Sequence, residues 1–213
     1  VAELSLSAGF CTVYTAMELQ NVMDSEAFHG AILGNDLTLT ETTIPAGKTL
    51  AVPEGTTLTV SGTLNVYGGT ITGGTATAGG GNVYMYRGTF NMNGGLILNG
   101  SANAAGNIYN NTSGYLNIND GIVAFGTAKA TGGNLRHAAT SCVTTMADGL
   151  IYGGTAPEGG NCYVNNGKFT MTGGSLTSLN GHMFHVTNTH AVITLTGVEL
   201  VNEDDENILL SVC

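Results

Sequence analysis

Gly81-Asn82-Val83-Tyr84 is the first of four similar stretches in this chain of 213 residues. The others are Gly106-Asn107-Ile108-Tyr109, Gly133-Asn134-Leu135-Arg136 and Gly160-Asn161-Cys162-Tyr163, at successive spacings of 25, 27 and 27 residues. Repeats of roughly 20 to 50 residues are typical of stacked units, none of which can bury its apolar face alone. The repeat therefore predicts a solenoid.

Each copy continues into a segment in which large apolar residues alternate with Asn, Thr or other small residues. A period of two is typical of a strand with one buried face. A third short strand follows each segment, as in Leu96-Ile97-Leu98. We expect two inward columns of side chains, formed by Phe90, Leu116, Thr144 and Phe169 and by Met92, Ile118, Met146 and Met171.

This pattern predicts an all-β, parallel β-helix solenoid with about 25–27 residues and three strands per coil. Successive coils would lie about 4.8 Å apart, the usual spacing of hydrogen-bonded strands. Asn82, Asn107, Asn134 and Asn161 then fall at one turn position, where an Asn amide can bond the amide of the next coil. We interpret this column as a structural ladder rather than as a set of ligands.

The ends of the chain differ from the repeats. Residues 1–54 are predicted to form an N-terminal cap with the first strands, residues 55–198 the coils, and residues 199–213 an acidic, unfinished last coil, after which we expect the natural chain to continue. Thr15-Ala16-Met17-Glu18 matches a capping box that opens a short helix ending near Asp24. Such a helix would cover the apolar end and the open strand edge of the first coil.

Composition and charge exclude several classes of function. Charged residues make up 9% of the chain, against about 25% in ordinary domains, and no run of 18 apolar residues predicts a membrane span. The net charge of −10 divides into −6 for residues 1–54, +1 for residues 55–198 and −5 for residues 199–213. A nearly neutral solenoid wall without a basic stripe argues against nucleic-acid binding.

The Gly-Gly-Asn-(Val/Ile)-Tyr phrase, the element from Phe90 to Asn93 and the turn from Ile44 to Leu50 resemble a known family. They are similar to right-handed parallel β-helix surface proteins of anaerobic bacteria, which are adhesin-like, and distantly similar to the repeats of polymorphic outer-membrane proteins. The resemblance implies a right-handed coil and a secreted or cell-surface location. It specifies fold and location better than activity.

A polysaccharide-degrading lyase or hydrolase is the catalytic alternative, because such enzymes use clustered carboxylates with an Arg or Lys. Asp120 and Asp148 occupy the same turn position in adjacent coils and would lie about 5 Å apart, close enough to share a proton or a cation. Each of them precedes a glycine, which is also ordinary turn chemistry. We therefore favour a protein without catalytic activity.

Neither the histidines nor the cysteines predict a metal site or a cofactor. His182 and His185 would lie on opposite faces of a strand, and no third ligand has suitable spacing. The cysteines at positions 11, 142, 162 and 213 permit three pairings if all are bridged. Cys162 falls in the inward column of Val83 and Ile108, where a small core residue is expected.

The candidate binding residues are Tyr84, Tyr109, Arg136 and Tyr163, each of which follows an inward residue and so points outward. An aromatic ladder flanked by Asn and Thr suits neutral sugars, which offer apolar ring faces and hydroxyls. Stacked tyrosines that only stabilise the wall, or that lie beneath a loop, remain the alternative.

The sequence thus favours a secreted or surface-attached protein with an adhesive or structural role. Its expected partners are host or environmental glycans or surface proteins, with self-association through the β-helix ends as a further possibility. A purely structural stalk or filament subunit is the remaining alternative.

Overall fold

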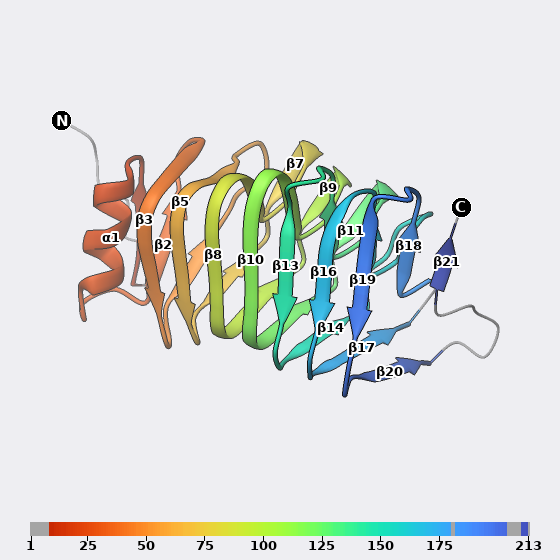
Figure 1. The fold of residues 1–213 in the computed structure, drawn as a ribbon. Helices are drawn as coiled ribbons and strands as arrows, with labels where there is room; N and C mark the ends of the chain where they lie inside the picture. The colour runs from red at the N-terminus through yellow and green to blue at the C-terminus, as the bar shows by residue number, and fades with distance from the viewer. Residues whose placement is uncertain (1–8, 180–181, 204–209, 213) are drawn as a thin grey trace.

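The computed structural model describes residues 9–179, 182–203 and 210–212 of the chain. The protein is a parallel β-solenoid of about seven turns with one short helix near its N-terminus, as predicted (Figure 1). In Figure 1 the front strands β13, β16 and β19 run downward, and the chain then passes along the bottom through β14, β17 and β20 before it returns at the back. Since it advances toward the C-terminus as it does so, the coil is right-handed.

Three columns of parallel strands form the wall. The first column contains β1 (Phe10–Val13), β2 (Gly30–Leu33), β4 (Thr49–Ala51), β6 (Thr70–Thr72), β14 (Leu150–Tyr152), β17 (Ser175–Ser178) and β20 (Glu199–Asn202). The second contains β12 (Leu135–His137), β15 (Cys162–Val164), β18 (Phe184–Val186) and β21 (Leu210–Val212). The third contains β13 (Val143–Met146), β16 (Gly167–Met171) and β19 (Ala191–Leu195).

Four longer strands run through more than one column. They are β3 (Leu37–Pro45), β5 (Leu58–Tyr67), β8 (Val83–Leu98) and β10 (Ile108–Ala124), and β8 and β10 visit all three columns in turn. Glycines allow the bends between columns. Gly95, for example, has φ +91, and a Cβ there would lie 2.2 Å from the carbonyl oxygen of Gly69 in the previous coil.

The predicted inward columns are confirmed. Phe90 pairs with Leu116, Leu116 with Thr144, and Thr144 with Phe169, and all four side chains are fully buried. Met92, Ile118, Met146 and Met171 form the neighbouring buried row. Cys162 lies beneath Leu135 in the second column and is buried as expected. The core is therefore built by stacking side chains from equivalent positions of successive coils.

The turn position that recurs in successive coils holds a continuous interior ladder of amides. Asn82 Nδ2 donates to Asn107 Oδ1 at 2.7 Å, Asn107 Nδ2 to Asn134 Oδ1 at 2.7 Å, and Asn134 Nδ2 to Asn161 Oδ1 at 2.8 Å. Each Oδ1 also accepts from a glycine N–H, which belongs to Gly74, Gly100, Gly126 or Gly154. Since these four side chains are fully buried, the ladder satisfies groups that water cannot reach.

Helix α1 (Ala16–Asp24) closes the N-terminal end of the solenoid (Figure 1). It starts with the predicted capping box between Thr15 and Glu18 and buries Leu19, Val22 and Met23 against the strands below it. Lys48 Nζ donates to the carbonyl oxygens of Ser25 and Phe28, just beyond the helix C-terminus. A cation suits this end of a helix, where carbonyl groups are left without helical partners.

A fourth strand in three of the coils was not predicted. β7 (Thr75–Gly79), β9 (Ser101–Ala104) and β11 (Thr127–Thr131) pair in parallel as a separate three-stranded sheet, which we call the side sheet. It lies between the first and second columns in chain order. Isolated bridges extend it on either side, from Thr75 to Glu54 and from Thr127 and Thr131 to Thr155 and Glu158. These strands contain Thr, Ala and Gly but no large apolar residue. The alternation of inward and outward side chains along them is therefore not evident from the sequence.

Substitutions in the buried ladder should lower the stability of the protein far more than substitutions of polar residues on its surface. We expect Asn107→Ala to lower the free energy of unfolding by about 3 kcal/mol, because it leaves buried groups of Asn82, Gly100 and Ala124 without their partner. Asn119→Ala removes an amide bond of the same kind to Asn93 on the exposed surface and should change it by less than about 1 kcal/mol. Urea denaturation of both variants measures the difference, and equal losses would contradict an interior role for the ladder.

Candidate functional site

The four candidate binding residues lie next to one another in one row of the second column. The register places Tyr84 beside Tyr109, Tyr109 beside Arg136, and Arg136 beside Tyr163. The rings of Tyr84 and Tyr109 meet edge to face with centroids 5.5 Å apart. Burial raises the pKa of Tyr109, with the positive charge of Arg136 opposing the shift. The row thus forms a continuous stack, in which Tyr84, Tyr109 and Arg136 are partly buried and Tyr163 is buried.

Arg136 is held between two aromatic rings. Its guanidinium carbon lies 5.2 Å from the ring centroid of Tyr109 and 5.4 Å from that of Tyr163. Tyr163 is only 9% exposed, and its other neighbour is His185, whose ring stacks on it at 5.3 Å with an interplanar angle of 9°. The faces of Arg136 and Tyr163 are therefore occupied by protein groups and offer no platform to a ligand.

His185 extends the row and was missed by the sequence analysis. Its Nε2 lies 3.9 Å from the carboxylate of Glu158. The signal was present, since Phe184-His185 aligns with Cys162-Tyr163 in the repeat. To use this signal, one would have had to treat the imidazole ring of His185 as equivalent to the aromatic rings of the row.

Tyr84 is a member of the row that lines a cavity. A groove of about 410 Å³ lies between the start of the second column and the side sheet. Its walls include Tyr84, Thr38 and Thr59 on one side and residues 76–79 of β7 on the other, with Asp36 and Thr57 completing it. The phenolic oxygen of Tyr84 accepts a hydrogen bond of 2.8 Å from Asn111 Nδ2, which fixes the ring. We call this cavity the tyrosine groove.

Tyr109 is half-buried because the side sheet passes close to it. A Cβ at Gly79 would lie 2.6 Å from the Tyr109 ring, so the glycine makes room for this aromatic side chain. The four residues predicted to form an aromatic ladder thus do lie in one row. The side sheet then decides that Tyr84 borders the groove and that the others pack within the wall.

The two candidate carboxylates lie elsewhere, at the bend between the third and first columns. Gly149 stacks directly on Gly121, so Asp120 and Asp148 occupy consecutive turns. Each carboxylate accepts a hydrogen bond from the N–H of the glycine that follows it, at 2.6 Å and 2.7 Å. Neither residue lines the grooves described here, and Arg136 belongs to a different column. Their geometry is accounted for by turn formation.

A buried polar cluster interrupts the apolar core. His137 is fully buried, with Nδ1 3.3 Å from the carbonyl oxygen of Asn166 and Nε2 2.5 Å from Thr144 Oγ1. Nδ1 therefore carries the proton, and Nε2 accepts from the Thr144 hydroxyl. Asn110 Nδ2 lies 3.3 Å from the same ring nitrogen. Because the ring has no access to solvent, this histidine has a structural role.

The described cysteines are all free and buried. Cys142 Sγ donates to the carbonyl oxygen of Asn110 at 3.3 Å, and burial raises the pKa of this thiol. Burial also strongly raises the pKa of Cys162, which keeps it a protonated core residue. Cys213 lies outside the described residues. No three His, Cys, Asp or Glu side chains in the described part of the chain are grouped to hold a metal ion.

Comparison of the chain with family models, with curated proteins and with solved structures finds no match. Within residues 9–179, 182–203 and 210–212, no helix has the length and apolar character needed to cross a membrane. The site must therefore be interpreted from its own chemistry.

Burial lowers the pKa of His137 from 6.5 to about 4. Its neutral form therefore contributes stability that is complete above pH 6.5 and is lost as the pH falls toward 4, because the unfolded chain takes up the proton first. We expect the free energy of unfolding to drop by about 2 kcal/mol between pH 7 and pH 5 from this group.

Urea titrations at the two pH values measure this loss. His137→Asn introduces the residue that the neighbouring coil has at the equivalent position, Asn110, and should flatten the pH dependence of the unfolding free energy. The control His190→Asn, at an exposed position, should leave this pH dependence unchanged. An equally steep dependence in His137→Asn would show that other groups cause the acid sensitivity.

Proposed function

We propose that this chain is a secreted or cell-surface β-helix with an adhesive role, which binds neutral sugar units in the tyrosine groove. The observation that carries the proposal is the meeting of an aromatic ring, several hydroxyls and a carboxylate in one cavity. Tyr84 supplies the ring, Thr38, Thr57, Thr59 and Thr77 the hydroxyls, and Asp36 the carboxylate. At about 410 Å³ the cavity falls within the range of small-molecule sites, roughly 300 to 1,000 Å³.

The chemistry of the groove matches that of a pyranose ring. An aromatic face packs against the C–H groups of a sugar, while hydroxyl and carboxylate oxygens hydrogen-bond its hydroxyls. One oxygen of Asp36 accepts a 2.8 Å bond from the Thr57 N–H, which fixes the carboxylate. The second oxygen has no partner among the described residues, so it is available to a sugar hydroxyl. A groove on rigid strands is also preorganised, which lowers the entropic cost of binding.

A structural spacer is the second candidate. About seven stacked turns at about 4.8 Å each give a rod of roughly 35 Å. Helix α1 closes one end of this rod, which favours a terminal position over a repeating filament subunit. The catalytic alternative gains no support, since Asp120 and Asp148 are engaged in their own turns.

A glycan-array screen of the parent chain with two variants tests the proposal. We expect binding of neutral oligosaccharides by the parent and a loss of affinity of about tenfold or more in Tyr84→Ala, because the stacking platform is removed. Tyr115→Ala is the matched control, since Tyr115 is 51% exposed on the third column and lies outside the groove. It should bind like the parent.

Circular dichroism first establishes that all three proteins are folded. A parent chain that binds no neutral glycan would overturn the proposal and leave the spacer role. An equal loss in both variants would assign any binding to a different surface.

A further inference from the structure

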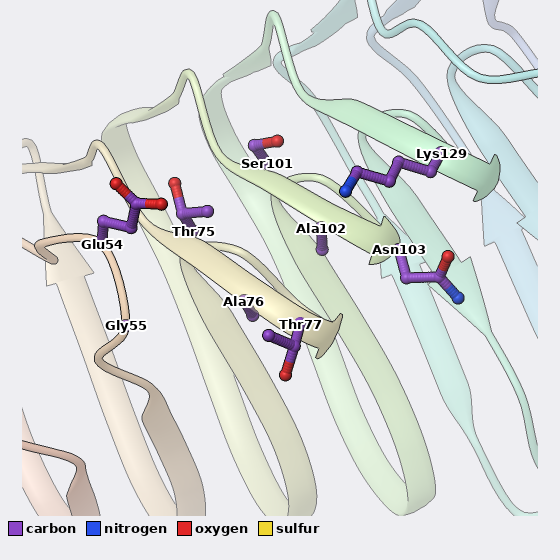
Figure 2. A pocket seen from close by; sticks show the side chains of 9 residues that line it. All are labelled: Glu54, Gly55, Thr75, Ala76, Thr77, Ser101, Ala102, Asn103 and Lys129. Atoms are coloured by element: carbon purple, nitrogen blue, oxygen red, sulfur yellow. The ribbon is translucent and has the colours of Figure 1, made fainter.

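A second groove lies on the outer face of the side sheet, and nothing in the sequence analysis pointed to it. It has a volume of about 280 Å³ and is lined by residues from four successive coils (Figure 2). Glu54 and Gly55 border it at one end, Thr75, Thr77, Ser101 and Asn103 form its floor with two alanines, and Lys129 closes the other end. We call it the lysine groove.

The polar side chains of the lysine groove project from one face because of the alternation in the side sheet. Ala102 and Ala128 are buried, so their neighbours Ser101, Asn103 and Lys129 face outward. The register places Thr75 beside Ser101 in the next coil. Hydroxyl, amide and ammonium groups are thereby presented at intervals of about 4.8 Å along the solenoid axis.

These side chains have no protein partners in the described part of the chain. The polar rows elsewhere behave differently, since Asn65, Asn91 and Asn117 on the third column bond to one another at 2.8–2.9 Å. No hydrogen bond or ion pair joins the side chains of Glu54, Thr75, Thr77, Ser101, Asn103 and Lys129 to other described residues. Six donor or acceptor groups therefore converge on one concavity and remain available to a ligand.

Lys129 is the group that selects the ligand. Lys48 is engaged by carbonyl oxygens, and Arg87 and Arg136 by aromatic rings. Lys129 and Lys168 have no such partner among the described residues, and of these two only Lys129 lines a groove described here. Figure 2 shows its side chain extended back over the sheet toward Ser101, so the ammonium lies above the floor of the groove.

We propose that the lysine groove binds a terminal acidic sugar, that is, a polyhydroxylated ring that carries one carboxylate. Lys129 pairs with the carboxylate, Ser101, Thr75 and Asn103 bond the ring hydroxyls, and Glu54 accepts a hydroxyl at the far end. A simple carboxylate without hydroxyls would leave most of these groups unused. The volume, close to the lower limit of roughly 300 Å³ for small-molecule sites, suits one sugar unit.

The distribution of charge selects a single acidic unit over a polyanionic chain. Residues 1–54 carry a net charge of −6 and contribute the Glu54 carboxylate to the groove itself, whereas residues 55–198 carry only +1. Repeated anions along a polysaccharide would meet this repulsion with only one local cation to offset it. A glycan whose anionic unit is confined to its end avoids the penalty.

The two grooves are neighbours, because Ala76 and Thr77 line both. One glycan could therefore contact both, with a neutral unit at Tyr84 and its acidic end at Lys129. The proposal for the lysine groove does not depend on the tyrosine groove, since the two use different side chains for their main contacts.

Binding of sialyllactose and of lactose to the parent chain, measured by isothermal titration calorimetry, tests the inference. We expect tighter binding of sialyllactose, and a loss of about tenfold or more in Lys129→Gln, in keeping with the strength of a charged hydrogen bond. Lys168→Gln is the matched control, because it removes the same charge from an exposed lysine outside the groove. It should retain the affinity of the parent.

Every outcome bears on the inference. Equal affinity for the two sugars, absence of sialyllactose binding, or equal losses in Lys129→Gln and Lys168→Gln would overturn it. Tyr84→Ala separates it from the proposed function, because that variant should lose affinity for lactose while it keeps the preference for the acidic sugar. Sialyllactose binding by a parent that ignores neutral glycans would support the lysine groove and overturn the tyrosine groove.

Discussion

The interior asparagine ladder aligns the successive coils of the solenoid. A parallel coil has no hairpin to fix its register, so each turn must be aligned with the previous one by contacts between like positions. The amides of Asn82, Asn107, Asn134 and Asn161 provide this alignment, since the first three each donate to the next amide and all four accept from a glycine N–H of their own coil. A shift of one residue would break both bonds and turn the apolar columns outward.

Small residues beside the ladder allow the side sheet to form. The glycines before each asparagine approach the backbone of the next coil too closely for a Cβ, as at Gly106, where a Cβ would lie 2.2 Å from the N of Thr127. The strands that precede them are rich in Ala and Thr and project as a separate sheet. Residues of this sheet line both the tyrosine groove and the lysine groove.

The buried cluster around His137 shows how far the repeat can be modified. Met85 and Val164 fill the positions one coil before Asn110 and one coil after His137, and both are apolar. His137 is tolerated because Thr144 supplies a hydroxyl and Asn166 a carbonyl at hydrogen-bonding distance. The side-chain amide of Asn110 donates to the carbonyl oxygen of Val143 at 3.2 Å and lies 3.3 Å from His137 Nε2. Buried polar groups need such partners, and a single apolar replacement in the cluster would leave the others unsatisfied.

The architecture follows from patterns in the amino-acid sequence alone. A repeat of 25 to 27 residues with a period-two pattern specifies stacked parallel strands, and the capping box at Thr15 specifies the covering helix, because both signals are local or recur at a fixed interval. The sequence also placed Tyr84, Tyr109, Arg136 and Tyr163 in one row, although Tyr163 is buried rather than outward. That Tyr84 borders the tyrosine groove becomes apparent only in three dimensions.

Whether a residue borders a groove depends on the side sheet and on contacts between coils. The short Ala and Thr strands of the side sheet have no distinctive pattern in the sequence. Arg136 lies between two rings because coil stacking brings it there, and Lys129 shares a groove with Glu54 although 75 residues separate them in the chain. Periodicity fixes the row to which a residue belongs. The depth of a groove and the partner of a charged side chain depend on how the strands of the side sheet pack beside those of the columns. The repeat does not encode this packing.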